Sequence, residues 1–142
     1  MGCVVAKVAV SKAVYAIDKP YDYLVPAALE DRLRPGMRVL VPFGAGNRGS
    51  DGIVLALAQQ ETGGGLKAIT AALDEEPVLD RRGLQLALWM RERYFCTVYD
   101  AVKAMLPAGL YYALRDCVKL TVDREGAYEA AQGSAAATKL VD

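Results

Sequence analysis

The residues of this chain whose types best suit ligand binding lie in the segment K-P-Y-D-Y-L-V-P, residues 19–26. Asp22 stands between Tyr21 and Tyr23, and alternation along a strand would place the two rings on one face and the carboxylate on the other. A carboxylate accepts hydrogen bonds from hydroxyl groups, and an aromatic face stacks on flat ligands. Taken alone, Asp22 and the isolated Lys67 are more simply interpreted as solvated surface residues.

Enzyme chemistry has little support in these residues. The chain has no histidine, which removes the usual general base near neutral pH. Cys3, Cys96 and Cys117 are widely spaced, and no pair has the spacing of metal ligands. We expect reduced, buried thiols and no metal, no cofactor and no catalytic residue in this chain.

A glycine-rich segment, Gly44–Gly49, matches the pattern G-x-G-x-x-G. A dinucleotide-binding loop needs a strand before it and a helix after it, so that the helix N-terminus faces the pyrophosphate. Here Ser50, Asp51 and Gly52 lead into a further apolar, strand-like run, so the pattern predicts a hairpin loop. The phosphate-binding pattern G-x-x-x-x-G-K-[ST] does not occur, and we expect no nucleotide hydrolysis.

Composition and charge limit the classes of partner. Of 142 residues, 54% are hydrophobic and 24% are charged, which is typical of a globular chain with a core. Residues 1–60 carry seven Lys and Arg against five Asp and Glu, and residues 61–142 carry ten against twelve. A nucleic-acid contact must therefore be local and pocket-like rather than a broad basic face. No targeting or membrane-spanning segment is evident, so we expect a cytoplasmic protein without a membrane partner.

The hydrophobic pattern predicts five short strands followed by two helices. The strands are expected at 3–10, 21–25, 37–42, 53–58 and 67–73, with one helical turn within 27–33 and a long loop at 44–52. Asp80 would cap a helix to about Phe95, which is apolar on most sides and is expected to be buried against the strands. A second helix is expected over 98–105, and a further strand over 117–122. These elements predict an α+β fold, a small twisted β-barrel of about five to six strands packed by two helices.

Seven segments between residues 4 and 110 form an ordered set. They are Y-D-Y-L-V-P (21–26), R-P-G-M-R-V-L-V-P-F-G (34–44), G-I-V (52–54), L-K-A-I (66–69), L-D-E-E-P-V (73–78), L-A-L-W-M-R-E-R-Y-F (86–95) and A-M-L-P (104–107). Together they resemble the N-terminal 3′-DNA-binding domain of primosomal protein N′ (PriA), the bacterial replication-restart helicase. The resemblance lies in their order and spacing, since no single segment is diagnostic.

The resemblance implies a shallow pocket for the terminal nucleotide at the 3′ end of a nascent strand at a stalled fork. On the matching positions, Tyr21 would flank the base and Asp22 would accept hydrogen bonds from the terminal nucleotide. Gly44 would let the protein backbone come close to the nucleotide, because glycine has no Cβ. Lys67 would supply a hydrogen-bond donor or a positive charge to the acceptor atoms of the nucleotide. We add Asn47 and Arg48, at the tip of the expected hairpin, as phosphate contacts.

The resemblance also implies a division of the chain. Residues 1–110 would form the 3′-end-binding domain, and residues 111–142 a connecting strand and the start of a truncated, winged-helix-like domain. The proteins resembled are ATP-dependent 3′–5′ DNA helicases with a winged helix, two helicase lobes and a cysteine-rich zinc insertion, none of which is matched here. We therefore expect a non-catalytic domain of a longer protein.

The expected partner is DNA with a free 3′ end, single-stranded or forked, together with other primosome proteins or single-strand-binding proteins. A small barrel whose groove takes a peptide is the alternative from another class, and the neutral charge favours it. Recognition of RNA ends by a similar architecture is a third, weaker interpretation.

Overall fold

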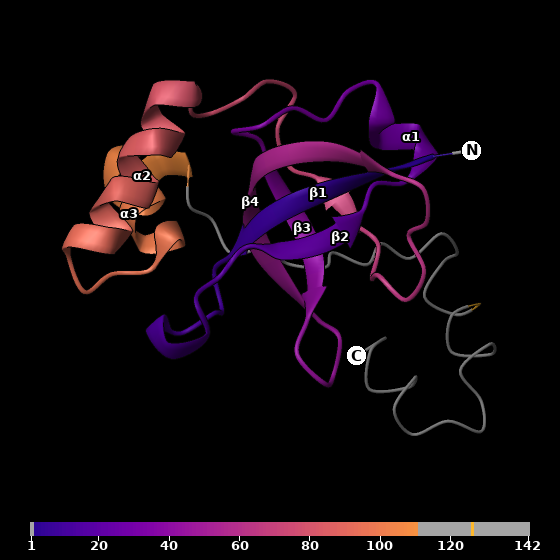
Figure 1. Cartoon of the computed structure of the whole chain (residues 1–142), viewed down its shortest axis with the longest axis horizontal. Coiled ribbons are helices and arrows are strands. Elements are labelled where there is room, and N and C mark those ends of the chain that lie inside the picture. The colour runs from indigo at the N-terminus through magenta and orange to yellow at the C-terminus, as the bar shows by residue number, and fades with distance from the viewer. Residues whose placement is uncertain (1, 111–125, 127–142) are drawn as a thin grey trace. The chain divides into compact units, whose positions relative to one another are not determined.

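A computed structural model of the chain describes residues 2–110 and 126, and contacts group Met1–Leu110 into one compact unit (Figure 1). The strand expected over 117–122 and the winged-helix-like start expected within 111–142 lie outside the described residues. In the described part of the chain, no helix is long and apolar enough to cross a membrane.

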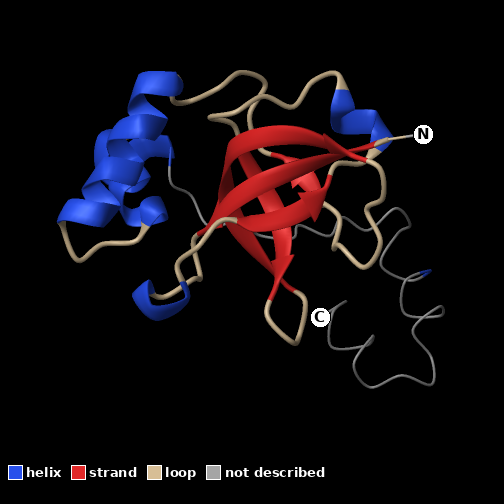
Figure 2. Ribbon diagram, in the orientation of Figure 1, coloured by secondary structure: helices blue, strands red, loops and turns tan. Residues whose placement is uncertain are grey.

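Five strands form one antiparallel sheet in the order β2-β1-β4-β3-β5. Figure 2 shows how these strands wrap around one another. Their bounds are β1 Cys3–Val10, β2 Tyr21–Leu24, β3 Arg38–Phe43, β4 Arg48–Gln60 and β5 Ala71–Ala72. All five overlap the apolar runs that predicted them, although β5 covers only two residues of its run, and the single helical turn α1 (Ala27–Glu30) also lies where it was expected.

The connection between β3 and β4 is shorter than its composition suggests. Only residues 44–47 form the turn, and Arg48 already pairs with Phe43 at the start of β4. The prediction of a long loop over 44–52 is therefore wrong, because Ser50, Asp51 and Gly52 continue the ladder opposite β3. The interpretation of the glycine-rich pattern as a hairpin rather than a nucleotide-binding loop is confirmed.

The sheet does not close, so the predicted barrel is not confirmed: the observed fold is α+β with an open five-stranded sheet. The strand expected over 67–73 pairs with β3 only at Ala71 and Ala72. Its first half turns toward the opposite edge, where Leu24 of β2 donates to the Lys67 carbonyl at 2.9 Å and accepts from the Ile69 N–H at 3.0 Å. One parallel bridge between Leu24 and Ala68 thus spans the gap that a barrel would close with a full ladder.

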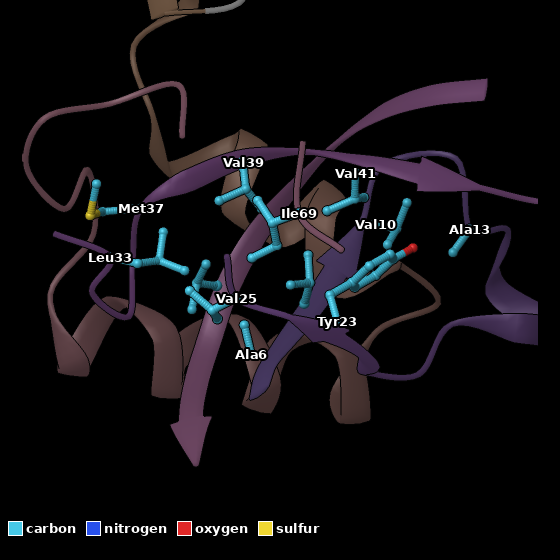
Figure 3. Packing of buried hydrophobic residues seen from close by; sticks show 12 residues of the cluster. Ala6, Val10, Ala13, Tyr23, Val25, Leu33, Met37, Val39, Val41 and Ile69 are labelled. Atoms are coloured by element: carbon cyan, nitrogen blue, oxygen red, sulfur yellow. The ribbon is translucent and has the colours of Figure 1, made fainter. Parts of the chain in front are cut away.

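The inner face of the curved sheet carries the main core. Alternate residues of β1 and β3 point into it, because side chains on a strand face opposite sides in turn. Figure 3 shows these side chains converging between the strands. The fully or nearly fully buried members are Ala6, Val8, Val10, Ala13, Tyr23, Val25, Leu33, Met37, Val39, Val41, Val54 and Ile69.

Two helices, α2 (Arg81–Arg93) and α3 (Val98–Met105), cover part of the outer face. They pack on each other and, in one buried cluster, on Ala9 of β1 and Ile53 of β4. Asp80 caps α2 as predicted, since its carboxylate accepts from the Gly83 N–H at 2.8 Å. The expectation that α2 is buried on most sides is wrong: only its Leu84 and Ala87 are buried, and Trp89 is 51% exposed.

The buried carboxylate of Asp18 connects the segment between β1 and β2 to both helices. Asp18 follows a 3₁₀ turn, η1 (Tyr15–Ile17), and its side chain is only 1% exposed. Its Oδ2 accepts from the Arg91 guanidinium of α2 at 3.1 Å and from the Val98 N–H at the start of α3 at 3.0 Å. The negative charge also faces the positive end of the α3 dipole, which is stabilising.

The Asp18→Ala substitution should therefore destabilise the fold by about 2–4 kcal/mol, because it leaves the buried Val98 N–H without its acceptor and removes the carboxylate from the half-buried Arg91, which keeps its bond to the Asp18 carbonyl. Urea unfolding followed by circular dichroism measures the change. Asp31→Ala, at an exposed carboxylate, is the matched control and should change the free energy of unfolding by no more than about 0.5 kcal/mol. Equal effects of the two substitutions would contradict the fastening role of Asp18.

Candidate functional site

A pocket of about 440 Å³ opens at the end of the sheet where β2, the β3–β4 turn and the segment before β5 meet. It is lined by Ile17, Tyr21, Asp22, Tyr23, Pro42, Phe43, Gly44, Gly65, Leu66 and Lys67. The four residues that the sequence singled out for the terminal nucleotide come from three separate segments, and the fold brings all of them to this one pocket: Tyr21, Asp22, Gly44 and Lys67.

The aromatic side of the pocket is rigid. The rings of Tyr21 and Phe43 meet edge to face, with centroids 5.2 Å apart, and the Tyr21 hydroxyl donates to the Ile17 carbonyl at 2.8 Å. Tyr23, on the same face of β2, is buried, and its hydroxyl donates to the Pro42 carbonyl at 3.0 Å. Two hydroxyl anchors therefore fix the tyrosines, and the half-buried Tyr21 ring keeps a surface against which a flat ligand can pack.

Asp22 points to the opposite face of β2, as alternation predicts, and it is not alone there. Lys7 lies directly across on β1, and its Nζ is 3.1 Å from Oδ1 of Asp22. Both side chains are partly exposed, at 51% for Lys7 and 37% for Asp22, so water screens the pair and its contribution to stability is small. The other oxygen, Oδ2, makes no hydrogen bond to any residue that the structure describes.

Gly44 and Lys67 face each other across the mouth of the pocket. The Lys67 ammonium donates to the Gly44 carbonyl at 3.0 Å. Gly44 has a left-handed backbone, φ +75°, and a Cβ placed on it would meet no atom within 4 Å. Glycine is thus favoured here by its backbone conformation and leaves open space in front of the peptide, which a ligand can enter.

Asn47 and Arg48 do not line the pocket. Both are exposed at the β3–β4 turn, where Asn47 has a left-handed backbone, φ 47°. Asparagine is one of the few residues that tolerates this conformation, so the turn geometry accounts for its presence. Their assignment as phosphate contacts stays a prediction that the geometry does not bring together with the other four residues.

Sequence reasoning missed residues in the pocket and beside it. Lys7 does not line the pocket but pairs with Asp22, and this position could not be predicted because it depends on the register between β1 and β2. Ile17 contributes through a 3₁₀ turn for which the sequence gives no clear signal. Phe43 had a signal, since it directly precedes Gly44 in the segment R-P-G-M-R-V-L-V-P-F-G.

Other features of the described residues offer no competing site for chemistry. Within residues 2–110 and 126, no group of three or more acidic, Cys or His side chains is placed to hold a metal ion. A second, larger hollow of about 650 Å³ lies between β4 and α2 and is lined mainly by leucine, alanine and proline side chains. None of the residues predicted to bind a ligand lines it.

Comparison with known proteins finds similarity to one family. The family model of the PriA 3′ DNA-binding domain (3′BD) matches residues 7–107. The replication restart protein PriA of Bacillus subtilis is 36% identical over 107 residues, which is 74% of this chain and 13% of that protein. PriA of Treponema pallidum is 33% identical over 98 residues, 65% of this chain and 15% of that protein. The probable replication restart protein PriA of Mycobacterium tuberculosis is 34% identical over 93 residues, 65% of this chain and 14% of that protein.

Tyr23 lines the pocket, and its pKa allows its contribution to the stability of the fold to be tested. Burial, and secondarily the neighbouring Tyr21, raise this pKa above the ordinary value of 10. The unfolded chain therefore loses this proton first, so the stability that Tyr23 contributes is present below pH 10 and is lost as the pH rises toward its folded pKa.

Tyr23→Phe should lower the free energy of unfolding by about 1 kcal/mol at pH 8, because it removes the hydrogen bond to Pro42. The difference from wild type should then shrink above pH 10, where ionisation already penalises the wild-type fold. Urea unfolding between pH 8 and pH 11 measures both effects. A difference that stays constant or widens above pH 10 would show that Tyr23 is not held in its neutral form by the fold.

Proposed function

Because this chain belongs to the family of PriA 3′ DNA-binding domains, we propose that its pocket holds the 3′-terminal nucleotide of a DNA strand. The observation that carries the proposal is the convergence of Tyr21, Asp22, Gly44 and Lys67 on one pocket from three segments of the chain. The resemblance to the family singled out these four positions, and in the fold all four line the same pocket. Each also has a chemistry suited to the end of a strand.

The terminal base would pack against Tyr21, whose ring gives affinity for any base without strong sequence preference. The free 3′-hydroxyl would donate to Oδ2 of Asp22, while Lys7 holds Oδ1 and keeps the carboxylate in place. The sugar–phosphate backbone would pass in front of Gly44, where no side chain obstructs it. Lys67 would exchange its contact with the Gly44 carbonyl for one with the ligand.

The curated relatives matched here are named replication restart proteins, and the chain spans only 13–15% of their length. In a protein of that kind, the domain would hold the 3′ end of a nascent strand at a stalled fork and so orient the rest of the protein. The chain itself would bind without catalysing a reaction and without a cofactor. The chain has 17 basic and 17 acidic residues, and this net charge of zero is compatible with a ligand bound at its end in a pocket rather than along a charged surface.

Discrimination between strand ends tests the roles of Asp22 and Lys7. The wild-type chain should bind a strand ending in a 3′-hydroxyl better than one ending in a 3′-phosphate, because the phosphate would lie against the carboxylate. Asp22→Asn should weaken binding of the hydroxyl end by about 1.5 kcal/mol, the lower range for a hydrogen bond to a charged group because Asp22 is partly exposed. It should also improve binding of the phosphate end, since Lys7 is then left unpaired.

Lys7→Gln should act in the opposite direction and enlarge the preference for the hydroxyl end, because the carboxylate then has no compensating charge. Fluorescence anisotropy with short labelled strands measures the affinity of each protein for both ends, and Asp31→Asn serves as the control at an exposed carboxylate outside the pocket. Equal binding of both ends by wild type, unchanged in either variant, would refute the proposed role of the pair. Binding of peptides but of no DNA strand would favour a protein-interaction module instead.

Filling the space before Gly44 tests the pocket itself. Gly44→Asn should cost no more than about 1 kcal/mol of stability, since asparagine tolerates a left-handed backbone. Its side chain would occupy the open space in front of the peptide and should weaken binding of a 3′-hydroxyl strand by at least about 1.4 kcal/mol, or tenfold. Gly46→Asn, in the same turn but outside the pocket, is the matched control and should bind as wild type does. Normal binding by Gly44→Asn would place the DNA elsewhere.

A further inference from the structure

Four exposed aromatic side chains beside the helices form two ring pairs, joined through the consecutive residues Tyr94 and Phe95, and are here called the aromatic patch: Tyr15, Trp89, Tyr94 and Phe95. Their exposed fractions are 43%, 51%, 56% and 97%. The rings of Tyr15 and Phe95 lie 6.0 Å apart between centroids, and those of Trp89 and Tyr94 lie 5.9 Å apart. Soluble proteins seldom expose large contiguous apolar surface, so this patch indicates a binding surface.

One arginine contacts a ring of the patch, and a second lies on the same helix. The Arg91 guanidinium lies over the Tyr15 ring, 5.0 Å from its centroid, and it is held there by Asp18. The last turn of α2 carries Arg91 and Arg93 with one acidic residue, Glu92, between them. Arg93 lies four residues beyond Trp89 and therefore projects from the same stripe of the helix. Stacking rings interleaved with cations are the features with which proteins bind single-stranded nucleic acid.

The aromatic patch is linked to the pocket by one short turn. In η1, Tyr15 belongs to the patch, and Ile17, two positions later, lines the pocket and accepts the Tyr21 hydroxyl. Figure 1 shows this indigo turn between the α2–α3 connection and the β3–β4 hairpin. Lys19 follows, and its ammonium lies 5.6 Å from the centroid of the Tyr21 ring. A polyanion leaving the pocket over η1 thus passes exposed basic and aromatic groups.

We propose that the nucleotides preceding the 3′-terminal one cross η1 and stack on the aromatic patch. The proposal rests on the proposed function, since the pocket must hold the terminal nucleotide for the strand to take this path. A single strand, rather than a protein, is favoured by the basic residues among the rings and by the continuity of the patch with the pocket. Stacking of this kind is tolerant of sequence, because every base has an aromatic face.

The test compares 3′-hydroxyl strands of two lengths, a dinucleotide and a strand of about eight nucleotides, the range that such surfaces cover. Trp89 is the single tryptophan of the chain, so its fluorescence reports on the patch directly. The dinucleotide should bind without changing Trp89 emission. The longer strand should bind about tenfold tighter or more and should quench that emission.

Phe95→Ala should remove most of this gain for the longer strand and leave dinucleotide affinity as in wild type. Because Phe95 is 97% exposed, the substitution should not disturb folding. Leu88→Ala is the matched control, an exposed apolar side chain of α2 that lines the other hollow instead, and it should keep the gain. Gly44→Asn should weaken strands of both lengths.

Failure of this inference and failure of the proposed function give different results. If the dinucleotide binds but the longer strand binds no tighter and leaves Trp89 emission unchanged, the pocket stands and the proposed path is wrong; the patch then faces protein. Equal losses for both lengths in Phe95→Ala would also overturn the path. If neither strand binds, the proposed function fails and the path fails with it.

Discussion

Two backbone hydrogen bonds at Leu24 hold the candidate site together. Leu24 ends the edge strand β2, and its N–H and carbonyl bond to Lys67 and Ile69 from the segment that leads to the opposite edge of the sheet. They bring the backbone of Lys67 to the end of β2, beside Tyr21 and Asp22. The same bonds bury Ile69 in the core, so the core and the pocket are stabilised by one arrangement of the backbone.

The sequence was sufficient to predict most elements, because their periodicity is local. The strands at Cys3–Val10 and Arg38–Phe43 and the helix capped by Asp80 follow directly from alternation and capping. Closure of the sheet was not predictable in this way, since it depends on whether distant edges form a full ladder or one bridge. The burial of α2 was misjudged for a related reason: an apolar helix surface looks the same in sequence whether it meets a core or a ligand.

The site was predicted through resemblance to a family more than through physical pattern. Composition alone gave Asp22 and Lys67 no special role, and the ordered motifs supplied it. What the motifs did not supply is the Lys7 partner of Asp22, which arises from cross-strand register, and the link from Ile17 to Tyr15 through η1. The neutral net charge of the chain is consistent with this site, because only a few basic side chains lie near the pocket and each has its own contact.

Mapping a bound strand onto the chain by NMR tests the central claim most directly. A ¹⁵N-labelled chain titrated with a short 3′-hydroxyl strand should show its largest amide shift changes at Tyr21, Asp22, Gly44 and Lys67. The same strand ending in a 3′-phosphate should produce smaller changes at these positions. Largest changes in the hollow between β4 and α2, or no changes at the four pocket residues, would contradict the claim that this pocket holds a DNA 3′ end.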